Sequence, residues 1–308
     1  MPGTSILLPF IIQGLAFGAM YAVTGTSIVV LYRTTGVVNL AFGAIGSMGV
    51  HIVWSLMGGS LILPEPRASG FAILLYPALV AVCALIFLIY GWFLAPLLDR
   101  RDALAKSLGT VALALFLMGI MKERWDTSKP RSMHFPNSTF RVGGTVVTTT
   151  QVLALLFALA VVIVVGIYLK RTETGTAMRA IANNRETSGL LGVPVRRVEA
   201  MAWFGAGILC GCVFLLLPSL FKSMDQATLT WFVIPALAGA IVGQLRSLWI
   251  TFGASLLIGV VESVLTPFHG NLQFLATYRR LTPVVISVVA ILWISRRRTV
   301  VLAGREMS

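Results

Sequence analysis

Glu262 is the only carboxylate that lies well inside an apolar segment of this chain, and His51 lies in another such segment. Ionisable side chains at membrane depth are costly, so each is a candidate for contacting a polar solute. Glu262 could line a polar path or hold a structural hydrogen bond. The structural role is favoured because the residue lies near the outer end of its segment, where burying a charge costs less. His51 is expected to be an interfacial histidine for the same reason.

The residue types needed for catalysis or metal binding do not occur at the required spacings. No G-x-x-x-x-G-K-[ST] phosphate loop is present, so this chain does not cradle ATP in the usual way. The motifs H-E-x-x-H and G-x-S-x-G are also absent. The histidines and cysteines show no ligand spacing: His51, His134, His269, Cys83, Cys210 and Cys212. We therefore predict that the chain is not an enzyme and binds no metal or cofactor of its own.

The composition indicates that Glu262 and His51 lie in membrane-spanning helices. The 308 residues are 57% hydrophobic and 11% charged, whereas soluble domains carry about 25% charged residues. A helix needs roughly 20 apolar residues to cross a bilayer. Such segments occur at 6–32, 36–57, 71–97, 103–121, 150–169, 198–220, 229–245, 247–266 and 281–295. We predict an all-α polytopic membrane protein, a single transmembrane domain over 1–308 with eight or nine crossings.

Two of these segments, 36–57 and 229–245, are weaker because the first is glycine-rich and the second is short. Either could be a broken or re-entrant helix, and irregular backbone at membrane depth is tolerated only where protein or a water-filled cavity covers it. The alternative is ordinary close packing through small residues, as the spacings Gly14/Gly18, Gly239/Gly243 and Gly43/Gly46/Gly49 allow. The sequence leaves both interpretations open.

The basic residues orient the chain. The net charge is +13, and most lysines and arginines fall in loops that lie on one side if segment 6–32 runs from outside to inside. The positive-inside rule then predicts an outer N-terminus and a cytoplasmic C-terminus. Membrane topology and anionic lipid explain this charge better than nucleic acid does, because no basic stripe with interleaved aromatics occurs outside the spans. The outer loop at 122–149 contains RVGGTVVTTT, which predicts a small hairpin around Gly143 and Gly144.

The largest polar stretch of the chain is residues 170–199, KRTETGTAMRAIANNRETSGLLGVPVRRVE. Thr174 or Thr176 could cap a helix over 177–190, and Gly192 with Pro194 could end it. A positive loop of this kind belongs on the cytoplasmic side. It is the largest surface through which a cytoplasmic partner could move the membrane segments.

Three stretches resemble motifs of a known family. Residues 14–43 end in Asn39-Leu40-Ala41-Phe42-Gly43, and Gly259 and Glu262 follow the pattern L-G-x-x-E. The pattern R-A…E-A-A-x-L-L-G-I is matched in the polar stretch by Gly175, Arg179, Ala180, Glu186, Leu190, Leu191 and Gly192. Together they resemble the permease subunits of branched-chain amino-acid (LIV-type) ABC importers, whose first motif reads N-F-A-H-G.

The resemblance implies a translocation subunit of the bacterial inner membrane. Its implied partners are a second homologous permease, two cytoplasmic ATPases that bind ATP and Mg, and an extracytoplasmic substrate-binding protein. A cytoplasmic helix at about 176–190 would dock on an ATPase. Its expected coupling residues are Arg179, Ala180, Asn183, Asn184, Arg185, Glu186, Leu190, Leu191 and Gly192. The expected translocation path includes Asn39, Phe42, Gly43, Gly239, Gly243 and Glu262.

The chain also departs from the family pattern. Leu40 and Phe42 stand where the motif has phenylalanine and histidine. Thr187 and Ser188 stand where the pattern has two alanines, and residues 243–247, GQLRS, where it has G-G-x-G-S. Branched-chain amino acids, urea, short amides and other small organic acids therefore stay open as substrates. A stand-alone secondary transporter or channel is the alternative function, but ion coupling would predict more titratable groups at membrane depth. A membrane-embedded enzyme or a scaffold lacks a nucleophile–base pair.

Overall fold

A computed structural model of the chain describes residues 4–56, 70–98, 101–125, 138–142, 145–220 and 226–265, together with 285–286 and 288–289. Five of the described helices are long and apolar enough to cross a membrane, and three shorter apolar helices accompany them. The all-α polytopic fold is thereby confirmed. The expected segment 281–295 lies almost entirely outside the described residues, so the choice between eight and nine crossings stays a prediction.

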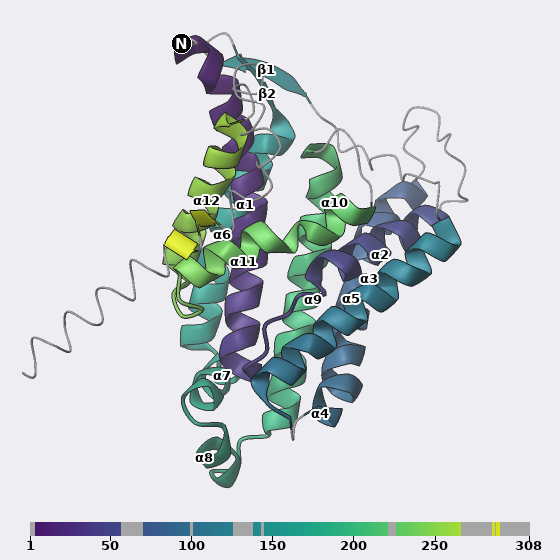
Figure 1. Cartoon of the computed structure of the whole chain (residues 1–308), viewed down its shortest axis with the longest axis vertical. Helices are drawn as coiled ribbons and strands as arrows, with labels where there is room; N and C mark the ends of the chain where they lie inside the picture. The colour runs from purple at the N-terminus through teal and green to yellow at the C-terminus, as the bar shows by residue number, and fades with distance from the viewer. Residues whose placement is uncertain are drawn as a thin grey trace, which may run out of the picture.

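The long helices are arranged around α1. They are α1 (Thr4–Thr35), α3 (Gly70–Ile89), α5 (Ala103–Trp125), α6 (Thr149–Arg171) and α9 (Val195–Leu220). In Figure 1, α1 is the purple helix that runs along the length of the bundle. Within its most apolar stretch 83% of the residues are buried, against 22% in α5 and 28% in α6. Thus α1 is the central helix, and α5 and α6 present apolar side chains outward, as helices that face lipid do.

The two weak segments are indeed broken. The first contains α2 (Phe42–Leu56), preceded by non-helical backbone at 36–41. The second is divided into α10 (Gln226–Trp231) and α11 (Val233–Val242), which are joined at Phe232. Hydroxyl groups of α5 satisfy the open backbone of the first break, since Leu40 N–H donates to Thr110 Oγ1 at 3.0 Å and Val38 N–H to Ser107 Oγ at 3.2 Å. Protein therefore covers this irregular backbone, as membrane depth requires.

Glycines allow α12 (Leu248–Val264) to lie directly against α1. A Cβ at Gly14 would stand 2.6 Å from Cα of Val260, and one at Gly18 would stand 2.7 Å from Cα of Leu256. A Cβ at Gly259 would in turn meet the backbone of Gly18. The small-residue spacing of Gly14 and Gly18 thus marks a real helix contact, in which backbones approach closely and gain dispersion energy.

The predicted hairpin is confirmed, while its place on the outer side of the membrane stays a prediction. Strands β1 (Thr139–Val142) and β2 (Thr145–Thr148) pair antiparallel, with Val142 opposite Thr145. The Thr148 side chain and Gln151 then form a capping box that begins α6. Figure 1 shows the hairpin and the N-terminus of α1 at one end of the bundle, and α7 (Glu173–Asn183) and α8 (Arg185–Leu190) at the opposite end.

The close contact between α1 and α12 yields a matched pair of variants. We expect Gly259→Ala to lower the stability of the purified protein by about 1–3 kcal/mol, because the added methyl group would overlap the backbone of α1. Gly253→Ala lies on the same helix, where a Cβ would meet no described atom within 4 Å. It should be neutral or slightly stabilising, since alanine favours helix. Thermal unfolding in detergent measures both, and equal shifts would contradict the contact.

Candidate coupling element and translocation path

The polar stretch folds as two short helices, so the single helix predicted over 177–190 is wrong. The first, α7, begins earlier than expected, because the side chain of Thr172, and not of Thr174 or Thr176, caps it by accepting from Gly175 N–H at 2.9 Å. The chain then leaves helical geometry at Asn184 (φ −153°, ψ 110°). The Asn184 side chain accepts from Thr187 N–H at 3.0 Å and begins α8. Asparagine is a strong N-cap, and here that preference divides the helix.

The helix α7 is firmly seated against the bundle. Its buried face consists of Gly175, Met178 and Ile181, and it packs on α1 and α6. A Cβ at Gly175 would meet the backbone of α6 at Tyr168 and Leu169, so the approach is as close as helices allow. At the other end, Gly192 adopts φ +86° and ends α8, as predicted, and Pro194 precedes α9. The element formed by α7 and α8 (173–190) is therefore a fixed projection at this end of the bundle.

The predicted coupling residues lie on the outside of this projection, with one partial exception. Ala180 is half-buried, whereas the others are exposed: Arg179, Asn183, Asn184, Arg185, Glu186, Leu190, Leu191 and Gly192. Leu190 and Leu191 stand out because they are 89% and 79% exposed at the tip of a polar element. Neighbouring apolar side chains exposed on a polar projection are typical of a protein-binding surface.

Arg185 differs from its neighbours because it makes an internal contact. Its Nε donates to Glu199 Oε1 at 2.8 Å and its Nη2 to Glu199 Oε2 at 3.2 Å, so α8 is bonded to α9 at two points. By contrast, Arg179 Nη2 donates to Thr176 Oγ1 on its own helix at 3.2 Å. Arg185 is thus a predicted coupling residue that also makes an internal contact, and its role in coupling stays a prediction. Fourteen residues separate it from Glu199, a spacing from which no local pattern predicts contact.

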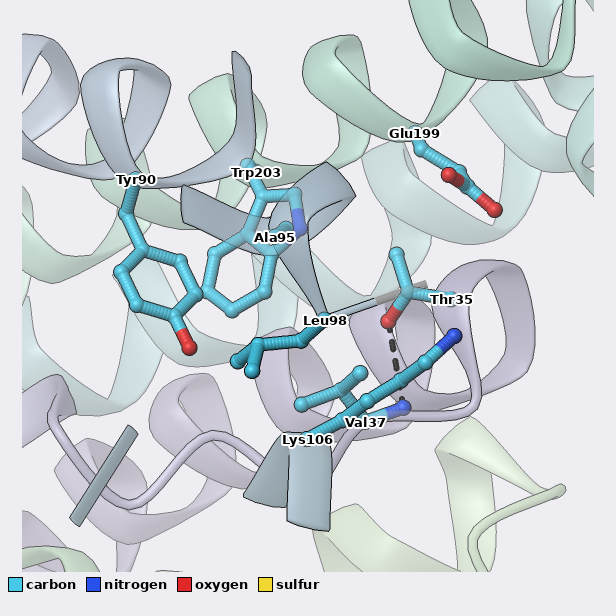
Figure 2. A pocket seen from close by; sticks show the side chains of 8 residues that line it. All are labelled: Thr35, Val37, Tyr90, Ala95, Leu98, Lys106, Glu199 and Trp203. Carbon is cyan, nitrogen blue, oxygen red and sulfur yellow. Dashed lines mark hydrogen bonds between the residues drawn. The ribbon is translucent and has the colours of Figure 1, made fainter. Parts of the chain in front are cut away.

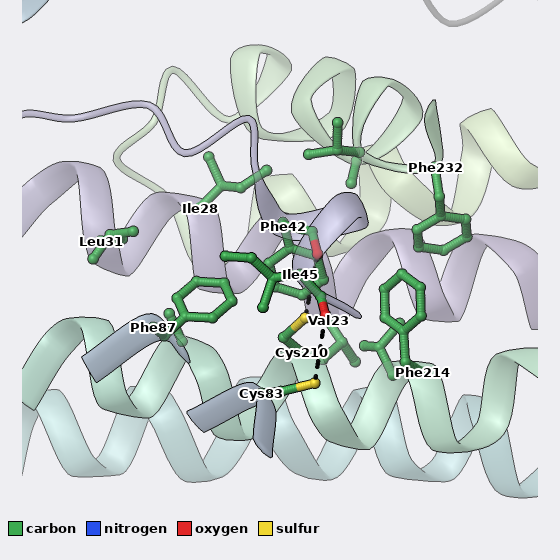
Figure 3. Close-up of a cluster of buried hydrophobic side chains, with 14 of the residues drawn as sticks. Val23, Ile28, Leu31, Phe42, Ile45, Cys83, Phe87, Cys210, Phe214 and Phe232 are labelled. Atoms are coloured by element: carbon green, nitrogen blue, oxygen red, sulfur yellow. Dashed lines mark hydrogen bonds between the residues drawn. The ribbon is translucent and has the colours of Figure 1, made fainter. Parts of the chain in front are cut away.

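The first group of predicted path residues lies in the core beside α10. Asn39 and Phe42 are buried, and the Asn39 Oδ1 accepts from Ala41 N–H at 2.9 Å while its Nδ2 has no partner among the described residues. Phe42 packs between Phe87 and Phe214 (Figure 3), with ring centroids 6.0 and 6.4 Å away. A Cβ at Gly43 would meet the backbone carbonyl oxygens of α10. The substituted motif position, Phe42, has thus become part of an aromatic core.

The second group lies on the other side of α1, along α11 and α12. A Cβ at Gly239 would meet Ser255, and one at Gly243 would meet Thr251, so both glycines serve helix packing. Glu262 Oε2 accepts from Tyr21 Oη at 2.9 Å, which is the structural hydrogen bond considered from the sequence. The structure does not bring the six path residues together in one site, and whether they line a path stays a prediction.

Two polar residues escaped the expectations from sequence. Tyr21, the partner of Glu262, is 4% exposed and lies in an apolar stretch where nothing marks it as polar. His51, expected at an interface, is fully buried; its Nδ1 lies 2.7 Å from the Ser47 carbonyl oxygen, and its Nε2 has no partner in the described part of the chain. Burial of a histidine depends on neighbouring helices, which a periodic pattern in one segment does not reveal.

A small pocket lies where α9 meets the ends of α1, α3 and α5 (Figure 2). It is lined by Thr35, Val37, Tyr90, Ala95, Leu98, Lys106, Glu199 and Trp203. None of the six predicted path residues borders it. Glu199, the residue that holds Arg185, does.

The turn between α11 and α12 has an unusual backbone. Leu245 N–H donates to the Ala240 carbonyl and Gln244 N–H to that of Ile241, both at 2.8 Å, which is the Schellman pattern at a helix end. That pattern normally places glycine in the left-handed region, but here Gln244 and Leu245 adopt φ 55° and 53°. Of these two residues, Gln244 stands at a glycine position of the G-G-x-G-S pattern and Leu245 at its variable position, while the other missing glycine is at Arg246. At Gln244 the chain therefore keeps the left-handed geometry without the residue that suits it.

The family of the chain follows from sequence comparison. The family described as "Branched-chain amino acid transport system / permease component" matches residues 10–294. This chain belongs to that family. It is a membrane permease subunit of the ABC-importer type, and the resemblance noted in its motifs is confirmed.

Relatives cover most of the chain. A probable branched-chain amino acid transport permease protein, LivH, of Methanocaldococcus jannaschii is 28% identical over 76% of this chain and 73% of its own length. The high-affinity branched-chain amino acid transport system permease protein BraD of Pseudomonas aeruginosa is 20% identical over 85% and 87%. The fructose import permease protein FruG of Bifidobacterium longum is 23% identical over 49% and 44%. The more extensive matches are thus to amino-acid permeases.

The left-handed turn yields a test of local strain. We expect Gln244→Val to lower the stability of the permease by about 1 kcal/mol, because a β-branched residue is poorly accommodated at positive φ. Gln244→Gly should be at least as stable as the natural chain. Arg246→Val, at an exposed neighbouring residue outside the left-handed region, is the control. The midpoint of thermal unfolding in detergent is the measurement, and a larger loss for Arg246→Val would refute the argument.

Proposed function

We propose that this permease subunit is driven by cytoplasmic ATPases that dock on the projection formed by α7 and α8, with Leu190 and Leu191 as the central contacts. The observation that carries the proposal is the exposure of these two leucines at the tip of a capped, firmly packed element. A rigid apolar anchor surrounded by polar residues is what a binding groove on a partner protein recognises. ATP and Mg are bound by the ATPases, and no phosphate loop occurs in this chain.

The proposed complex contains this chain, a second homologous permease, two ATPases and an extracytoplasmic substrate-binding protein. Membership of an ABC-importer permease family supports partners of these kinds. In this complex the projection lies in the cytoplasm and the β1–β2 hairpin outside, with the N-terminus outside and the C-terminus cytoplasmic. The opposite placement of the hairpin and the projection in Figure 1, together with the positive-inside rule, supports this orientation.

The proposed substrate is a branched-chain amino acid or a related small amide or organic acid. The family description and the names of the more extensively matched relatives support amino acids. A path between the helices of this bundle, which are apolar with few hydroxyls and amides, would suit a solute with an apolar side chain and a polar head. A stand-alone transporter is disfavoured, because members of the family are components of a multi-subunit system.

Docking through the leucine tip is testable by co-purification. We expect Leu190→Ala combined with Leu191→Ala to weaken ATPase association more than tenfold, since the loss of a central apolar anchor costs about 2 kcal/mol or more. The permease itself should remain folded, because both side chains are exposed. The amount of ATPase recovered with the tagged permease from native membranes measures the effect.

Leu104→Ala combined with Leu108→Ala is the matched control for this test. Leu104 and Leu108 are 73% and 56% exposed on α5, and the two substitutions remove the same atoms from a different helix. This control should leave ATPase recovery unchanged. Equal recovery with the Leu190 and Leu191 double variant and with the natural chain would contradict docking at the tip, and recovery of no ATPase with the natural chain would contradict the ATP-driven mechanism as a whole.

A further inference from the structure

The first turns of α9 connect the projection to the membrane bundle through side chains as well as through the backbone. The covalent connection from α8 to α9 passes through Gly192, whose φ of +86° and exposed position make it the natural point of bending. If the backbone were the only connection, a force on the tip could turn α8 about this glycine without moving α9. Two contacts made by Arg196 and Glu199 bear on this possibility.

The Arg185–Glu199 pair spans the glycine. Arg185 is the first residue of α8 and Glu199 lies in the second turn of α9, so their two hydrogen bonds join the helices on both sides of the bend. The Glu199 side chain is only 14% exposed, whereas that of Arg185 is 42% exposed. A planar guanidinium that donates to both carboxylate oxygens fixes orientation as well as distance. The pair thus holds α8 and the start of α9 as one body.

Arg196 connects the same turn of α9 to the end of α3. Its Nη2 donates to the Trp92 carbonyl oxygen at 3.1 Å, and its guanidinium lies 5.2 Å from the centroid of the Trp92 ring. Trp92 belongs to a π-helical turn, η1 (Tyr90–Leu94), that continues α3. Such turns are local irregularities that occur frequently at functional sites.

Trp203, one turn further along α9, packs into this irregular turn. A Cβ at Gly91 would meet the Trp203 side chain at 2.5 Å, and the Tyr90 and Trp203 ring centroids are 4.7 Å apart. The indole Nε1 is buried without a partner among the described residues, and Figure 2 shows it directed into the pocket toward Glu199 and Thr35. The pocket therefore leaves space beside α9 on the side that faces α5.

We infer that Glu199 is a positioning residue that transmits movement of the ATPase-docked tip to α9. The inference rests on the proposed function. Through Arg185 the carboxylate makes α8 and α9 move together, and through Arg196 and Trp203 the same helix engages η1. Movement of the tip then displaces α9 relative to α5, instead of bending the chain at Gly192. The docking residues and the transmitting residues are thus different: Leu190 and Leu191 bind, whereas Arg185 and Glu199 transmit.

The test uses the complete transporter, purified with its own ATPase and placed in lipid nanodiscs. Spin labels are attached to cysteines introduced at Met201 on α9 and Leu108 on α5, which are 50% and 56% exposed, after Cys83, Cys210 and Cys212 are changed to alanine. The distance between labels is measured without nucleotide and with ATP and vanadate. The reference is the labelled chain with no further substitution, and in it we expect the distance between the labels to shift when nucleotide binds. Glu199→Arg should retain the ATPase and lose the shift, because it places two guanidinium groups opposite each other.

Exchanging the two charges distinguishes loss of the Arg185–Glu199 contact from a general disturbance of the structure. Arg185→Glu combined with Glu199→Arg should restore the shift, and Arg185→Lys, which keeps the charge but not the two-point contact, should restore part of it. Arg141→Glu, the same charge change at an exposed residue of β1 at the opposite end of the bundle, should keep both ATPase and shift. The inference is overturned if Glu199→Arg releases the ATPase, if the exchanged pair fails to restore the shift, or if the reference shows no shift. Loss of ATPase from the natural chain would instead overturn the proposed function on which it rests.

Discussion

The close approach of α1 to its neighbours is the constraint on which the rest of the bundle depends. Gly14 and Gly18 bring the backbone of α12 against α1, where no side chain separates the two helices. In lipid, apolar burial adds little to helix association, so dispersion between backbones and the few internal hydrogen bonds carry more of the stability. The Tyr21–Glu262 bond joins the same two helices and satisfies a carboxylate that would otherwise be costly at this depth. The contact between α1 and α12 thus provides both close packing and the hydrogen bond that the Glu262 carboxylate needs.

The broken segments are possible only because other helices complete them. Backbone N–H groups of Val38 and Leu40 donate to hydroxyls of α5, and Gly43 lies against carbonyl groups at the end of α10. Two irregular elements therefore cover each other beside α1. This arrangement places Gly43 at the meeting point of α2 and α10, with Asn39 and Phe42 just before it in the chain. A rearrangement of short helices there would require less unwinding than one of long spans. The sequence motif and the structural discontinuity fall at the same place.

Much of this fold could be predicted from sequence because its signals are local. Apolar length gave the spans, the glycine-rich composition of 36–57 gave the break, and alternating β-branched residues around Gly143 gave the hairpin. The features that could not be predicted depend on competition between local structures or on contacts between residues that are distant in the chain. Asn184 could have stayed within a helix or capped a new one, and the cap prevailed. The Glu199 partner of Arg185 and the Tyr21 partner of Glu262 depend on how helices meet, and no single segment records that.

Contacts between residues distant in the chain also explain how the exposed projection could transmit a movement to the bundle. A polar loop between spans would transmit little if it bent freely, since displacement would be absorbed at its most flexible residue. Here the close approach at Gly175 fixes α7 against α6, and the Asn184 cap sets the direction in which α8 begins. The hydrogen bonds from Arg185 to Glu199 then restrict bending at Gly192. An ion pair at a protein surface contributes little to stability, typically under about 1 kcal/mol. Because the Arg185 side chain of this pair is 42% exposed, the pair is better explained by geometry than by stability. Its place across Gly192 supports the mechanical role that we infer for it, which its energy alone would not suggest.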